Sequence, residues 1–217
     1  MPGTLTDDIE VIDAGRGGGA GIPAGGDDDG DSGSGLPRVP QRAYFTAIQL
    51  ALAGIVMIFM ALTSSFLVRK GLGGDWVAFA LPRIVWVNTL VLLASSVTIQ
   101  IALRHIRQGD VASFRHWWTV TTGLGLLFLV GQVAAWRQLA SQGVFLATNP
   151  SSSFYYLLTA MHGLHLAGGI VALLYVLLRR RRRSQISQPT AASLASIYWH
   201  FMDGLWLFLV ALLYLGR

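Results

Sequence analysis

Five long apolar segments constrain this chain more than any other feature of its sequence. A helix needs about 20 apolar residues to cross the hydrocarbon core of a bilayer, and each segment is near that length. Because lipid offers no hydrogen-bond partners to the backbone, such segments form helices rather than strands. The sequence therefore predicts an all-α membrane protein with a bundle of five transmembrane helices within residues 43–217. We expect these helices at residues 44–68, 84–103, 117–139, 154–178 and 194–215.

Residues 1–42 have the opposite character. They contain GRGGGAG and GGDDDGDSGSG, and they carry eight of the eleven acidic residues of the chain. The stretch has too few apolar side chains to offset the conformational entropy lost on ordering, so we predict a disordered, acidic, glycine-rich tail. It lacks the basic start and apolar core of a secretory signal.

The charge beyond this tail is basic and lies between the apolar segments. The one dense basic run, Arg179–Arg183, directly follows an apolar segment, which indicates a topology signal or contact with anionic lipid rather than nucleic-acid binding. If the N-terminus is cytoplasmic, ten basic residues near helix ends lie inside and five lie outside. The positive-inside rule therefore predicts a cytoplasmic N-terminus. The chain has no cysteine, which excludes disulfides and thiolate metal sites.

Two ionisable side chains, His200 and Asp203, lie within the last apolar segment. A charge at the centre of a bilayer costs about 2.5–3.5 kcal/mol on insertion scales, so both side chains should face protein or water. The fourth segment carries His162 and His165 at the same i, i+3 spacing, which places each pair on one face of its helix. Two such faces could hold a metal, ligate a haem, relay protons or hydrogen-bond to each other.

The residue types present separate these alternatives only in part. A dinuclear metal site in a helical bundle uses several carboxylates, whereas Asp203 is the only one expected within the membrane. Haem ligation by His200 and a histidine of the fourth segment stays open. We favour a seam of hydrogen bonds between the fourth and fifth helices, with proton handling or lipid-headgroup binding as alternatives.

The second apolar segment carries a line of polar side chains that begins with Asn88 and Thr89. Ser95, Ser96 and Thr98 continue the line. Side chains of these types form hydrogen bonds between membrane helices. We therefore predict that this line faces another helix of the bundle.

Two motifs carry a resemblance to a known family. TAMHGLHLAGG (159–169) and YWHFMDGLWLFL (198–209) closely resemble the last two helices of subunit III of the haem-copper terminal oxidases, the cytochrome c oxidase type. SSFLVRKG with DW (64–76) resembles the end of the first helix in the five-helix bacterial forms, and VNTLVLLASSVT (87–98) resembles the second. The resemblance covers residues 43–217.

This resemblance implies an accessory subunit of a bacterial respiratory terminal oxidase that acts in aerobic electron transport, in the inner membrane. Such a subunit holds no haem or copper of its own and packs on the catalytic subunit I, which carries both. The family is understood to bind phospholipid between its helices and to sustain proton uptake. His162, His165, His200 and Asp203 are then the motif positions of a polar seam that shapes the subunit.

Alternatives to this function remain at the sequence level. The accessory subunit of a nitric oxide reductase shares these motifs and differs mainly in its partner. A small b-type haem electron carrier belongs to a different class and would use the histidines as ligands. Two positions also depart from the family pattern, because glutamates that family members often carry are replaced by Arg83 and Ala135. Any function of those glutamates is absent or relocated in this chain.

Overall fold

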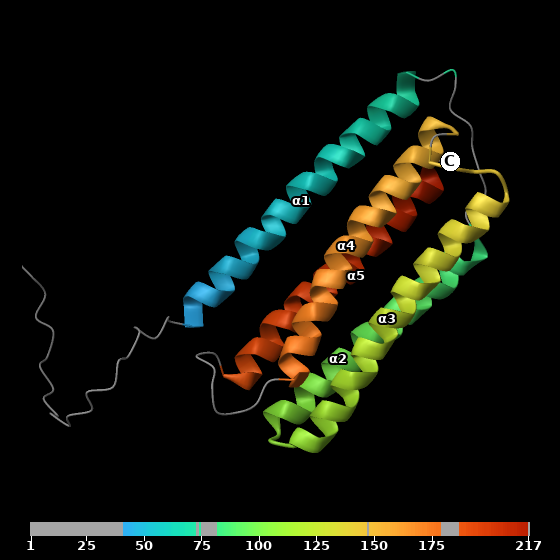
Figure 1. Ribbon diagram of the computed structural model, residues 1–217. Coiled ribbons are helices and arrows are strands. Elements are labelled where there is room, and N and C mark those ends of the chain that lie inside the picture. Colours follow the sequence, from blue (N-terminus) through green and yellow to red (C-terminus); the bar gives the residue numbers. More distant parts are fainter. Residues whose placement is uncertain (1–40, 73, 75–81, 147, 179–186, 217) are drawn as a thin grey trace, which may run out of the picture. The chain divides into compact units, whose positions relative to one another are not determined.

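The computed structural model describes residues 41–72, 74, 82–146, 148–178 and 187–216. Each of the five helices in these residues has the length and apolar composition needed to cross a membrane. The prediction of an all-α protein with five transmembrane helices is therefore confirmed. The helices are α1 (Gln41–Leu72), α2 (Arg83–Arg107), α3 (Val111–Ser141), α4 (Pro150–Leu178) and α5 (Gln188–Leu215), coloured from blue to red in Figure 1. The predicted acidic tail lies outside the described residues except for Gln41 and Arg42, with which α1 begins.

The helices extend beyond the apolar segments from which they were predicted. The starts of α3 and α5 are set by capping side chains rather than by the first apolar residue. Ser187, for example, caps α5, because its side chain accepts a hydrogen bond from the backbone N–H of Thr190. Pro189 then occupies the first turn, where its missing N–H removes no helical hydrogen bond. As a result, α5 begins six residues before the predicted start at Leu194.

The helices pack in a connected set in which α5 is the central member. Helix α2 packs against α3, α4 packs against α3, and α5 contacts α1, α2 and α4. The residues between these helices include large buried aromatic side chains, among them Trp118, Trp199, Trp206 and Phe128. Helix α1 contacts only α4 and α5 among the described helices, and it is the least buried of the five.

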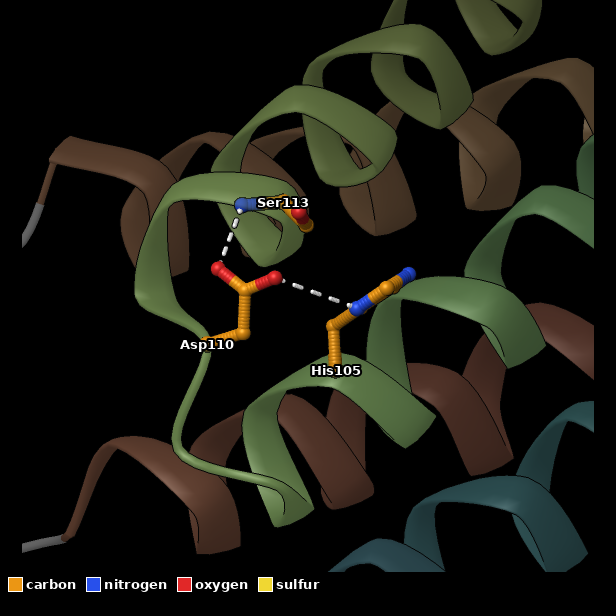
Figure 2. Close-up of polar contacts among 3 residues, drawn as sticks. All are labelled: His105, Asp110 and Ser113. Atoms are coloured by element: carbon orange, nitrogen blue, oxygen red, sulfur yellow. Dashed lines mark hydrogen bonds and ion pairs between the residues drawn. The ribbon is translucent and has the colours of Figure 1, made fainter.

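A short turn joins α2 to α3 and is held by Asp110 (Figure 2). One carboxylate oxygen accepts a hydrogen bond of 3.1 Å from the backbone N–H of Ser113, which caps α3. The other oxygen lies 3.4 Å from Nδ1 of His105, in the last turn of α2. Hydrogen bonds from the side chain and backbone of Ser113 lower the pKa of the Asp110 carboxyl below its ordinary value. Gly109, with a φ of 81°, supplies the left-handed residue that ends α2.

Removal of this cap is expected to loosen the start of α3 in a pH-dependent way. At neutral pH, Asp110→Ala should make the first amide groups of α3 exchange hydrogen several-fold faster, whereas Asp110→Asn keeps an acceptor and should lose less. Because the folded-state pKa of Asp110 is lowered, its stabilisation is complete above the ordinary pKa of 3.8 and is lost as the pH falls through the lowered value. Hydrogen exchange in neutral and strongly acidic buffer measures both effects. A difference between the wild type and Asp110→Ala that persists in strong acid would contradict this account.

Candidate functional site

The most polar interface within the spans lies where α5 packs against α2, around His200. Nδ1 of His200 is 2.7 Å from Oγ of Ser96, and Nε2 is 2.6 Å from the amide end of Gln100. A neutral imidazole accepts at one nitrogen and donates from the other, so it bonds both residues at once: Nε2 accepts from the side-chain N–H of Gln100, and Nδ1–H donates to the Ser96 hydroxyl oxygen. His200 therefore joins two successive turns of α2 to α5.

Asp203 lies one turn further along α5 and is almost completely buried, with 6% of its surface exposed. The Ser96 hydroxyl reaches toward its carboxyl group. Neither carboxyl oxygen, however, makes a well-formed hydrogen bond with a described residue. Oγ of Ser96 accepts from Nδ1–H of His200, so its one hydroxyl proton is left for the side of Asp203. Asp203 is thus an ionisable group with incomplete pairing inside a membrane span, which is the usual mark of a functional residue.

Two tryptophans of α5 add further hydrogen bonds to this interface. The indole N–H of Trp199 donates to Ser95 and that of Trp206 donates to Thr89, each at 3.0 Å. We call this interface the α2–α5 polar seam. It consists of Thr89, Ser95, Ser96 and Gln100 on α2 and of Trp199, His200, Asp203 and Trp206 on α5.

Of the two histidines of α4, His162 packs against Trp206 of this seam, and His165 bonds within its own helix. The ring of His162 is fully buried between Phe128 and Trp206, with ring centroids 5.9 and 5.1 Å away. Nδ1 of His165 bonds to the carbonyl oxygen of Met161 in its own helix, at 2.7 Å.

The arrangement differs from the expected seam between the fourth and fifth helices. A spacing of i, i+3 predicts that two side chains share a face, but it carries no information on which helix that face meets. The hydrogen bonds of His200 go to α2 rather than to α4. One polar contact does join α4 to α5, from the Tyr198 hydroxyl to the backbone oxygen of His165, at 2.8 Å.

The polar line predicted on the second helix divides between two neighbours. Thr89 faces α5 through Trp206. Asn88 instead points at α3, where its amide donates to the carbonyl oxygen of Phe128 at 3.5 Å. Gly131 makes room for it, because a Cβ at that position would lie 2.1 Å from the side-chain oxygen of Asn88.

Three members of the seam were not predicted from the sequence. Gln100 follows Ser96 by four residues, so its place on the same face was available from the spacing. Trp199 and Trp206 were not predicted as seam residues, because their large apolar rings suit the core of any helical bundle. Only the tertiary structure shows that their N–H groups find hydroxyl acceptors on α2.

The described residues do not assemble a metal or haem site. No group of three or more His, Cys, Asp or Glu side chains comes together among them. Bis-histidine haem ligation does not fit the geometry either, because both nitrogens of His200 are engaged by α2 and the His162 ring packs on Trp206. At Ala135, where family members often carry a glutamate, the side chain is buried and apolar.

Five apolar helices joined by buried polar contacts define a multi-pass helical membrane protein. The family model of cytochrome c oxidase subunit III matches residues 44–216. The chain belongs to this family, as the resemblance of its motifs indicated, and it is a subunit of an oxidoreductase complex. Membership does not favour the nitric oxide reductase alternative.

Curated relatives agree with the family match. A protein of Mycobacterium tuberculosis named probable cytochrome c oxidase subunit 3 is 36% identical over 157 residues, which cover 70% of this chain and 77% of the relative. Cytochrome c oxidase subunit 3 of Thermostichus vulcanus is 35% identical over 167 residues, or 73% and 80% of the two chains. The protein of that name from Synechocystis is 32% identical over 164 residues, or 73% and 69%.

Proposed function

We propose that this chain is the accessory subunit III of a bacterial respiratory oxidase, where it packs on catalytic subunit I, retains lipid and supports proton uptake. The match to the family model over residues 44–216 carries this proposal. The haems and copper belong to partner subunits, which accords with the absence of a metal-ligating cluster among the described residues. The bacterial relatives support a location in the plasma membrane.

Retention of lipid is supported by two apolar grooves beside α1. The larger, of about 400 Å³, lies between α1, α4 and α5, and small side chains such as Gly168, Ala172 and Ala195 line it. The second, of about 310 Å³, lies between α1 and α5. Both grooves are almost entirely apolar, as an acyl chain requires, and both depend on α1 as one wall. Phospholipid chains in these grooves would fill the sparse interface between α1 and the other helices.

The orientation proposed for the chain has a cytoplasmic N-terminus. The C-terminal end of α2 and the start of α3 then face the cytoplasm, with Arg104, Arg107 and Arg115 exposed in or beside their connection. Gln100, seven residues before this end of α2, is the member of the polar seam nearest to it. Asp203 lies further from the proton-donating side of the membrane than Gln100 does.

Support of proton uptake rests on Asp203 and its neighbours in the seam. Asp203 is the only carboxylate in the described helices, and His200 lies one turn away with Ser96 between the two groups. Intramembrane ionisable residues that touch hydroxyl and imidazole groups are the usual components of proton-handling sites. With the two family glutamates absent at Arg83 and Ala135, this carboxyl is the candidate for that role.

Removal of the subunit from the complex tests this function. Initial oxygen consumption should be largely retained, because the redox centres lie in other subunits, and activity should then decay progressively during turnover as proton supply fails. An oxygen electrode follows both quantities, and the optical spectrum of the purified complex controls for haem assembly. Immediate and complete loss of activity in a complex with correctly assembled haems would contradict the accessory role and indicate direct catalysis.

A further inference from the structure

The outer edge of the α2–α5 polar seam reaches the surface of the helix bundle. Gln100 is exposed and His200 is partly exposed. Gln100 lies seven residues before the end of α2, or roughly 10 Å at the helical rise, and His200 lies roughly 18 Å from the start of α5. Both residues lie inside the apolar segments of their helices, Gln100 within residues 84–103 and His200 within residues 194–215.

The hydrogen bonding of Gln100 is incomplete. One end of its side-chain amide bonds to His200, and the other end has no partner among the described contacts. A glutamine amide offers both donors and an acceptor, whichever way it is turned. In hydrocarbon, an unpaired amide group is strongly unfavourable, so this exposed position is poorly suited to lipid.

Apolar side chains adjoin His200 and, on the side away from the exposed Arg104, Gln100. Leu93 and Val97 share its stripe on α2, and Val97 has 60% of its surface exposed. On α5, Ile197 and Leu207 lie one and two turns from His200 and are also exposed. An apolar surface that carries a few hydrogen-bonding groups, here Gln100 and His200, is the arrangement by which membrane helices select a partner helix.

The outer face of α3 provides a contrast within the same chain. Its exposed side chains in the middle of the span are all apolar, and they are Leu126, Leu127, Val130 and Val133. Such a face is compatible with lipid alone. The α2–α5 face therefore differs from the α3 face because it exposes hydrogen-bonding side chains, which a protein neighbour can pair and lipid cannot.

We propose that the face formed by Leu93, Val97 and Gln100 of α2 and Ile197, His200 and Leu207 of α5 docks a transmembrane helix of a neighbouring oxidase subunit. That helix presents a hydroxyl, amide or indole group to the free end of the Gln100 amide. The inference rests on the proposed function, because it assigns the surface through which the subunit joins its complex.

Site-specific photo-crosslinking in membranes that contain the whole complex tests this assignment. A photoreactive phenylalanine analogue at Val97 or Ile197 should give adducts with another protein subunit, whereas the same analogue at Leu127 or Val130 should give mainly lipid adducts. Mass spectrometry of the adducts identifies the neighbour. Lipid adducts alone at positions 97 and 197, in a complex that still contains the subunit, would overturn the inference and leave the proposed function intact.

A second variant tests the polar contact itself. Gln100→Leu preserves the size of the side chain and should reduce retention of the subunit in the detergent-purified complex several-fold. Val97→Leu is the matched control, because it alters the same face without removing a hydrogen-bonding group. Retention of Gln100→Leu at the level of this control would show that the amide makes no contact with a partner. Failure of the unaltered subunit to purify with the oxidase would instead refute the proposed function.

Discussion

Replacement of Trp199 by alanine is expected to lower the free energy of unfolding of this subunit by about 3–5 kcal/mol, the range for the loss of a large buried aromatic side chain. Trp199 has no exposed surface. Its ring contacts the backbone positions of Gly125 and Gly169, and its N–H donates to Ser95 at 3.0 Å. Truncation would therefore open a cavity at the point where α5 meets α2, α3 and α4. Unfolding of the purified subunit in mixed detergent micelles measures the loss.

Two further variants separate the packing of Trp199 from its hydrogen bond. Trp199→Phe keeps most of the ring but leaves Ser95 without its donor, so the expected cost falls to about 0.6–2 kcal/mol. Trp86→Ala is the matched control, because Trp86 is a tryptophan of α2 with 49% of its surface exposed. An equal loss of unfolding free energy in Trp199→Ala and Trp86→Ala would refute the central position assigned to Trp199.

Gly125→Val is expected to be the next most damaging substitution, with a cost of about 1–3 kcal/mol from overpacking. A Cβ at Gly125 would lie 2.6 Å from Cη2 of Trp199, a distance that real Cβ atoms do not tolerate. Trp199 cannot withdraw easily, because its indole N–H is bonded to Ser95. Gly123→Val provides a close control in the same helix, since no atom lies within 4 Å of a Cβ at that position. The control shares the helix-propensity change, so the difference in unfolding free energy reports the steric conflict.

The conflict should be relieved when the neighbouring ring is made smaller. In the double variant Gly125→Val with Trp199→Leu, the total cost should be less than the sum of the two single costs, because the added methyl groups fill space that the indole has vacated. A double-mutant cycle in the same unfolding assay gives this interaction energy. Additive costs would indicate that the two residues are not in contact.

The helix ends show where prediction from sequence reached its limit for the fold. Apolar segments of bilayer length required five helices, because the backbone has no other means of satisfying its polar groups in lipid. The same segments could not locate Ser187 or Asp110 as helix caps, since capping depends on side-chain oxygens in polar sequence where hydropathy has no signal. The helices were therefore predicted correctly in number and order but too short.

The candidate site shows a sharper division. The sequence identified His200 and Asp203 as costly groups that need partners, because their chemistry is incompatible with hydrocarbon wherever they lie in the bundle. It also identified the polar line on α2 that contains Ser96. It did not connect the two, and it placed the histidines of α4 opposite His200 instead.

What the sequence alone determined is thus the number of membrane helices, the family and the residue types that need polar partners. These follow from local composition, motif and the cost of polar groups in lipid. Only the tertiary structure decided that α5 turns His200 toward Ser96 and Gln100 of α2. The rotation of a helix and its choice of neighbour depend on the packing of many side chains, such as Trp199 against Gly125. The spacing of residues along a single helix does not predict this packing.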